Sequence, residues 1–86
     1  MKKVSYPALF TVDKEDPAWI NVSFPDIWGG VTCGQGMDDA LYMAKDLLKL
    51  MLETAPIQCE KPHSLEETKA NFPERVVMMV TVEIKD

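Results

Sequence analysis

The chain has 86 residues, of which 47% are hydrophobic and 27% charged, and its formal net charge is −5. A chain of this length forms one domain around a single core, and its hydrophobic share is too high for intrinsic disorder. We expect neither a secretory signal nor a membrane span, which needs roughly 20 apolar residues, and therefore place the chain in the cytoplasm. The acidic balance, without any cluster of Lys and Arg, argues against nucleic-acid binding and favours a basic protein partner.

Alternating hydrophobicity predicts three strands in the first part of the chain. Residues 3–12 alternate with period two, which is typical of a strand with one buried face. The acidic segment 13–17 predicts a hairpin turn, and a second alternating run covers residues 18–24. A loop over residues 25–30 precedes a short third strand at residues 31–33. The face expected to form the core carries Val4, Tyr6, Ala8, Phe10, Val12, Ala18, Ile20, Val22 and Phe24.

An amphipathic helix from Met37 to Ala55 follows. Its apolar residues fill an arc of about 200°, which is wider than the roughly 100° stripe of a surface helix. We therefore expect the helix to lie deep against the sheet. Its first turn holds two acidic residues, which the helix dipole favours there, and Pro56 ends it. The residues interpreted as core on the wide face include Met43, Leu50 and Met51.

The rest of the chain predicts a short helix and a last strand. Ser64 and Glu67 fit a capping box for a helix over residues 65–70. The last strand, Val76–Ile84, is apolar on both faces, so it is either central in the sheet or covered by a partner. We therefore expect a homodimer or a higher homo-oligomer. The order β-β-β-α-(short α)-β is an α+β layout in a single domain, residues 1–86.

No set of residues forms an enzyme signature. The Gly34-Gln35-Gly36 turn lacks the lysine and Ser/Thr of a phosphate loop, so it is interpreted as a tight turn from strand to helix. Cys59 and His63 are four residues apart, but two ligands do not make a zinc site. His63 is interpreted as a solvated loop residue. We expect no catalytic residue, no cofactor and no metal.

The loop at residues 25–30 is the most informative segment. Trp28 lies between turn residues, where a large ring is difficult to bury. It either packs back on its own domain or serves as an anchor for another protein, because aromatic residues dominate interface hot spots.

Four segments of the chain form a spaced set of motifs: Tyr6-Pro7-Ala8, Phe24-Pro25-Asp26-Ile27, Thr32-Cys33-Gly34 and Asp38-Asp39-Ala40-Leu41. Together these motifs resemble those of the HicB antitoxins, and the similarity covers essentially the whole chain. Two positions depart from the family pattern: Trp28-Gly29 stands where Pro-Gly is more usual, and Gly36 stands where a capping Thr is usual.

The resemblance implies a partial RNase H-like fold with strand order 3-2-1-4 and the main helix packed on one face. It also implies an antitoxin of a type II toxin–antitoxin system, which neutralises a basic HicA-like toxin that cleaves mRNA. Many relatives continue into a C-terminal DNA-binding domain, whereas this sequence stops at Asp86. We therefore expect no C-terminal DNA-binding domain in this sequence and no autoregulation of transcription by this domain alone, and the acidic charge balance predicts no direct nucleic-acid binding by it.

A metal-dependent nuclease on the same fold would use carboxylates such as Asp46 and Glu83, but its first strand would also need one, and residues 3–12 contain none. A stand-alone ligand-binding or sensor module remains the alternative to an antitoxin. For the antitoxin, the residues expected to contact the toxin are Asp26, Trp28, Asp38 and Asp39.

Overall fold

The computed structural model of the chain describes residues 1–85 and contains the predicted elements in the predicted order. One 3-10 turn, η1, joins the main helix to the connector that precedes the short helix. Within the described residues, no helix is long and apolar enough to cross a lipid bilayer. The elements are β1 (Lys2–Val12), β2 (Trp19–Ser23), β3 (Val31–Gln35), α1 (Gly36–Thr54), η1 (Pro56–Gln58), α2 (Leu65–Asn71) and β4 (Val76–Ile84).

The four strands form one antiparallel sheet of order β3-β2-β1-β4, which confirms the α+β fold and the expected strand order. β1 is long enough to pair with its two neighbours along different parts of its length. Its residues 2–10 pair with β4, and its residues 9–12 pair with β2. Pro7 lies where β1 has β4 on one side and no strand on the other, a position in a sheet where proline is tolerated when its nitrogen faces the open side.

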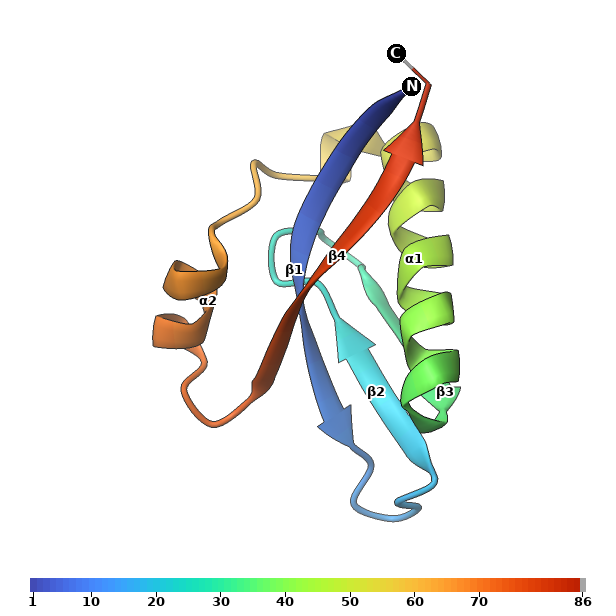
Figure 1. Cartoon of the computed structure of the whole chain (residues 1–86), viewed down its shortest axis with the longest axis vertical. Coiled ribbons are helices and arrows are strands. Elements are labelled where there is room, and N and C mark those ends of the chain that lie inside the picture. The colour runs from blue at the N-terminus through green and yellow to red at the C-terminus, as the bar shows by residue number, and fades with distance from the viewer. Residues whose placement is uncertain (86) are drawn as a thin grey trace.

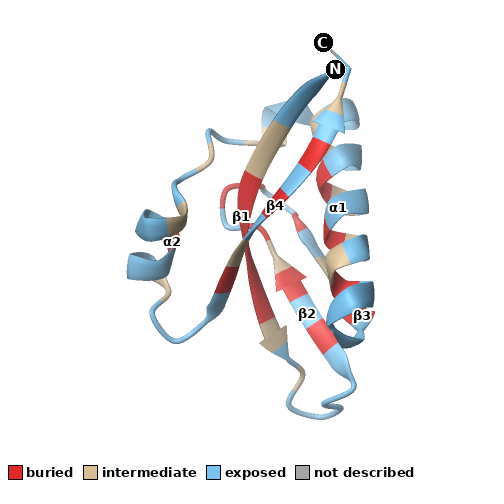
Figure 2. Cartoon of the chain, viewed as in Figure 1, coloured by how far each residue is buried: buried red, intermediate tan, exposed pale blue. Residues whose placement is uncertain are grey.

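The two helices lie on opposite sides of the sheet (Figure 1). α1 packs on one face, and most of the predicted inward residues of β1 and β2 form the core beneath it (Figure 2). Val12 is 56% exposed and Ala18 is exposed as well, so their expected places in the core are wrong, because both residues lie at the β1–β2 turn, at the end of the sheet. α2 lies on the other side and contacts β4. The core residues contributed by the strands and loops are Tyr6, Ala8, Phe10, Ile20, Val22, Phe24, Ile27, Val80 and Val82.

The face of the sheet opposite α1 is partly buried, which the alternation did not predict. Leu9 and Val77 are cross-strand partners on this face, and both are buried. Of the two expectations for the last strand, a central position in the sheet is wrong, and cover by a partner stays a prediction. β4 is an edge strand, and its second apolar face begins at Val77, on the side of the sheet where α2 lies.

The buried stripe of α1 is narrower than its apolar arc. Ala40, Ala44 and Leu48 recur every four residues and are completely buried against the sheet. Leu50 is 52% exposed, so its expected place in the core is wrong. The side chain at position 50 points away from the stripe because it lies two residues after Leu48, about 200° round the helix.

β3 and α1 approach each other closely at Gly34. A β-carbon at this position would lie 2.5 Å from the backbone nitrogen of Ala40 and 2.7 Å from its α-carbon. Both atoms belong to the helix backbone, which cannot move aside without displacing α1 from the sheet. The tight turn predicted at Gly34 is thus required by packing between a strand and the helix that follows it.

Replacement of Gly34 by Ala should lower the free energy of unfolding by about 3 kcal/mol, because the added methyl group forces α1 away from β3. Urea denaturation followed by circular dichroism measures this change. Cys33→Ala is the matched control, since the Cys33 side chain is exposed on the same strand. Equal stabilities of the two variants would contradict the packing argument.

Candidate functional site

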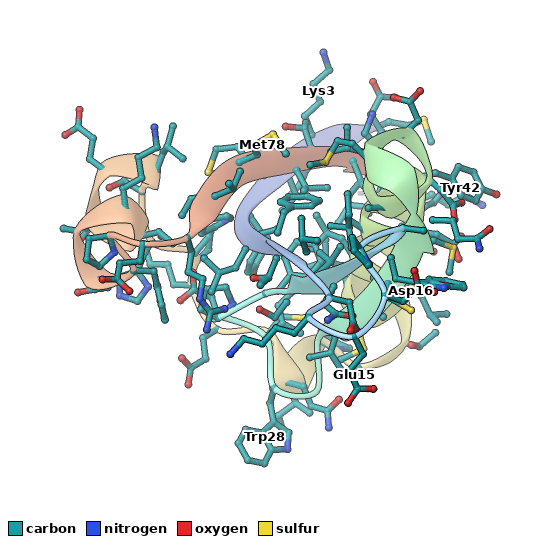
Figure 3. The ribbon with its side chains drawn as sticks, turned by 90° about the horizontal axis from the view of Figure 1, so that it is seen from below. Lys3, Glu15, Asp16, Trp28, Tyr42 and Met78 are labelled. Carbon is teal, nitrogen blue, oxygen red and sulfur yellow. The ribbon has the colours of Figure 1, made fainter. Side chains whose placement is uncertain are left out.

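The loop between β2 and β3 holds Trp28 outside the core. Ile27 is buried at 4% exposure, whereas the next residue, Trp28, is 78% exposed and projects from the molecule (Figure 3). The loop is closed by a hydrogen bond from Phe24 N–H to the Gly30 carbonyl at 2.8 Å. Gly29 takes a φ of +78°, a left-handed conformation that glycine adopts without strain. Of the two interpretations of Trp28, packing on its own domain is therefore wrong.

The Trp28 loop, residues 24–30, is joined to the connector after α1. Ile27 forms a β-bridge with Cys59, and the Trp28 N–H donates to the Gln58 carbonyl at 2.9 Å. One residue before Gln58, the side chain of Ile57 is 95% exposed. Two large apolar side chains thus reach solvent from backbone segments that hydrogen-bond to each other. Ile57 was not among the expected site residues, because a lone Ile after a proline carries no sequence pattern.

Asp26 fastens the same loop to the connector from inside. Its carboxylate accepts hydrogen bonds from the His63 backbone N–H at 2.9 Å and from His63 Nδ1 at 2.6 Å, and its carbonyl accepts from the Glu60 N–H. Asp26 is 4% exposed, so it lies beneath the surface and shapes the loop. The interpretation of His63 as a simply solvated residue is wrong, because its ring, although half exposed, is paired with this buried carboxylate.

The hydrogen bond with Asp26, followed by the charge of the same carboxylate, raises the pKa of His63 above its usual value. On the other side of the connector, Tyr6 donates its hydroxyl proton to the Glu60 carbonyl at 2.7 Å. Burial raises the pKa of the Cys59 thiol, which disfavours the thiolate that a metal would need. Among residues 1–85, no three potential ligands lie close enough together to hold a metal ion.

Acidic side chains gather at the opposite end of β2. The Asp13 N–H donates to the Trp19 carbonyl, and the Gly36 N–H donates to the Ala18 carbonyl, so the β1–β2 turn lies beside the start of α1. Both segments are acidic. We call this region the acidic end. It carries five carboxylates and a single basic residue, Lys14, so its net charge is −4, whereas the net charge of the whole chain is −5. Its acidic residues are Asp13, Glu15, Asp16, Asp38 and Asp39.

The structure does not bring the four expected site residues into one cluster. Asp38 and Asp39 lie at the end of the β2–β3 hairpin where Trp19 pairs with Gln35, and the Trp28 loop lies beyond the other end. One oxygen of Asp39 accepts the Gln35 N–H at 2.9 Å, which joins the last residue of β3 to the first turns of α1. Asp38 is exposed and makes no such contact with Gln35.

The acidic turn at residues 13–17 is evident in the sequence, but its proximity to the start of α1 is not. This proximity depends on the β2–β3 register, which places Trp19 opposite Gln35 and so brings two segments about 20 residues apart in the chain to the same end.

Exposed acidic and apolar patches on a small α+β domain are typical of the class of protein-binding modules. Comparisons with known proteins identify which module. Residues 6–86 match the model of the HicB-like antitoxin of bacterial toxin–antitoxin systems. The chain therefore belongs to the HicB-like antitoxin family.

The fold is also similar to that of a solved toxin–antitoxin complex from Streptococcus pneumoniae. The TM-score is 0.73 at 24% sequence identity, and the match covers 95% of this chain and 70% of the other. This likeness supports the fold. Comparison with curated protein sequences gives no match.

The His63–Asp26 pair should make stability depend on pH. The pKa of His63 is raised in the folded protein. The pair therefore stabilises the folded state in full at pH values below about 6.5, the pKa of histidine in an unfolded chain. This contribution to stability is lost as the pH rises through the pKa that His63 has in the folded protein. Urea unfolding of the wild type and of His63→Ala across this range should give a stability difference that shrinks with rising pH. A difference that stays constant would contradict the assignment.

Proposed function

We propose that this domain binds a basic HicA-like toxin that cleaves mRNA and neutralises it by covering the toxin's RNA-binding surface. Family membership supports the antitoxin role, and the concentration of charge at the acidic end carries the choice of a basic partner. An mRNA-cleaving enzyme binds a polyanion and must itself present basic residues. Because such a toxin acts on mRNA, the complex would form in the cytoplasm.

Electrostatic attraction is the first step of this mechanism. The turn at residues 13–16 and the start of α1 face solvent together, with Glu15 and Asp16 exposed (Figure 3). Clustered charge of one sign raises the association rate with a partner of the opposite sign, and the effect weakens with salt. The acidic end would occupy the positive surface that otherwise binds the phosphates of RNA.

Burial of apolar surface is the second step. Ile57 and Trp28 are the two most exposed large apolar side chains among the described residues, and the loop hydrogen bonds hold their backbones in place. A rigid aromatic anchor loses little conformational entropy on binding, which is why such residues concentrate binding energy. Asp26 contributes by positioning this loop through His63.

The edge strand β3 connects the two regions. Its five residues run from the acidic end to the Trp28 loop, a distance of about 17 Å at the usual rise of a strand. β3 is at the edge of the sheet, so a partner can lie along it and contact both regions. The contact surface we propose is therefore this edge with the acidic end and the Trp28 loop at its two ends.

A stand-alone ligand-binding module is the second candidate, and one observation favours it. On the sheet face opposite α1, a shallow groove of about 500 Å³ is lined by residues of β1, β2 and β3 and by Arg75. Its floor offers the polar side chains of Thr11, Asn21 and Ser23, which could bind a small polar molecule. Binding of a small metabolite, with no binding of a basic protein, would favour this candidate over the antitoxin.

Trp28→Ala should weaken toxin binding strongly, because it removes the apolar anchor. The probe is a small basic HicA-like toxin, and calorimetry gives the dissociation constant. We expect an increase of at least about 30-fold, the size of an interface hot spot. Leu50→Ala is the matched control, since Leu50 is also exposed but lies on α1. Equal effects would contradict the proposed surface, and absence of wild-type binding would contradict the function.

Neutralising the acidic end should act on the association rate. The double variant Asp16→Asn, Asp38→Asn should bind more slowly at low salt and show a weaker dependence of the rate on salt, because two attracting charges are gone. Stopped-flow mixing with the same basic protein measures both. Glu66→Gln, in the first turn of α2, is the control with a charge removed elsewhere. Identical salt dependence in all three proteins would rule out steering by this end.

A further inference from the structure

The outer edge of β4 is the longest unpaired strand edge in the described part of the chain. β4 extends over nine residues and pairs with β1 only. Neither helix covers this edge: α1 and α2 lie on the two faces of the sheet, and β4 runs across the front of the molecule between them (Figure 1). Seen from below, Met78 of β4 and Lys3 of the neighbouring β1 lie at the same border of the molecule (Figure 3).

This edge lacks the features by which proteins protect free strands. Such edges are usually short, bulged, or interrupted by proline or by charged side chains. β4 has no proline, and its only charged residue, Glu83, is next to its end. Val76 is more than half exposed, and Met79 is partly exposed in its centre. The opposite edge strand, β3, has only five residues and contains Gly34. An unprotected edge of nine residues presents unpaired backbone N–H and C=O groups with which the strand of a partner can pair.

We propose that two copies of this chain pair through β4, antiparallel about Met79, and form a continuous eight-stranded sheet. Pairing of identical antiparallel strands is isologous, so the two edges are related by a twofold axis and each residue contact occurs twice. The second copy is the occupant because the sequence of β4 is complementary to itself in one register.

In this register the cross-strand pairs match in character. Met79 lies opposite Met79, Met78 opposite Val80, and Val77 opposite Thr81, so apolar side chains meet across the centre. At both ends, Arg75 lies opposite Glu83 of the second copy. Opposite charges directly across an antiparallel pair are stabilising, whereas like charges there are destabilising. If the twofold axis lay at Thr81, two residues further along the strand, Glu83 would instead lie opposite Met79 of the second copy.

Two surface features agree with this register. Val76 of the second copy would lie opposite Val82, which lines a groove of about 410 Å³ between β4 and α1 together with Tyr42. Tyr42 is largely exposed in the single chain and would be covered at this junction. Arg75, now 3.3 Å from the Thr11 hydroxyl, would exchange this exposed contact for the carboxylate.

Pairing of two copies through β4 does not depend on the proposed toxin. β4 and β3 are the two opposite edges of the sheet, so pairing through β4 leaves the acidic end and the Trp28 loop accessible. Failure of self-association and failure of toxin binding are therefore separate results.

Sedimentation equilibrium of the full chain at tens of micromolar tests the proposal. We expect a dimer, at twice the chain mass of 9.7 kDa. Met79→Lys should raise the dimer dissociation constant at least about tenfold, because two lysines would face each other at the axis. Val31→Lys, an exposed apolar residue on the opposite edge strand, should leave the dimer intact. A monomeric wild type, or equal loss in both variants, would overturn the proposal.

Oxidative cross-linking tests the register without relying on a destabilising change. In a background with Cys33 and Cys59 replaced by Ser, Met79→Cys should form a covalent dimer, because the two β-carbons lie opposite each other across the axis. Thr81→Cys should not, because the two positions are separated by four residues along the strands. A covalent dimer from Thr81→Cys, or none from Met79→Cys, would overturn the register.

Discussion

The carboxylate of Asp26 lies beneath the surface and accepts two hydrogen bonds from a single residue, His63. A buried carboxylate is costly unless its oxygens are paired, and this one is paired with a backbone N–H and an imidazole. The consequence extends well beyond the pair. Through Asp26 the loop between the second and third strands and the connector after α1 become one layer, and the orientation of Trp28 depends on that layer.

The layer is needed because of the way β1 is paired. β1 meets β2 only over residues 9–12, so along its first half one side has no strand neighbour. The loop and the connector occupy that side, where Tyr6 bonds to the Glu60 carbonyl and Ile27 bridges to Cys59. Among the described residues, no buried side-chain nitrogen or oxygen lacks a hydrogen-bond partner. The loop and the connector thus cover the side of β1 that has no strand neighbour, and this arrangement places Trp28 at the surface.

Local patterns in the sequence predicted most of the fold. Alternation identified the inward faces of β1 and β2, and the spacing of Ser64 and Glu67 predicted a capping box that the structure contains. Both signals arise within one element, which is why they can be read from the sequence. The exposure of Leu50 could not be predicted in this way, because an apolar arc does not show how much of it the sheet will cover.

The candidate site was harder to predict, because its contacts join distant segments. His63 and Asp26 are 37 residues apart, and nothing in the proline-rich connector marks the histidine as a partner of a buried acid. The same reason explains why Ile57 was missed and why the acidic turn was not joined to the helix start. The family resemblance supplied the strand order, which alternation alone does not determine, and the register then placed the charges.

The pairing of β1 with β4 has a consequence for synthesis of the protein. Lys2 pairs with Ile84, and Val4 with Val82, so β1 is completed by a strand that is synthesised about 80 residues later. Until β4 has left the ribosome, the central strand lacks a neighbour over most of its length, and the α1 side of the core lacks Val80 and Val82. Contacts of such long sequence separation form slowly. The nascent chain therefore cannot fold progressively from its amino terminus, and its ability to bind a partner should arise in one late step.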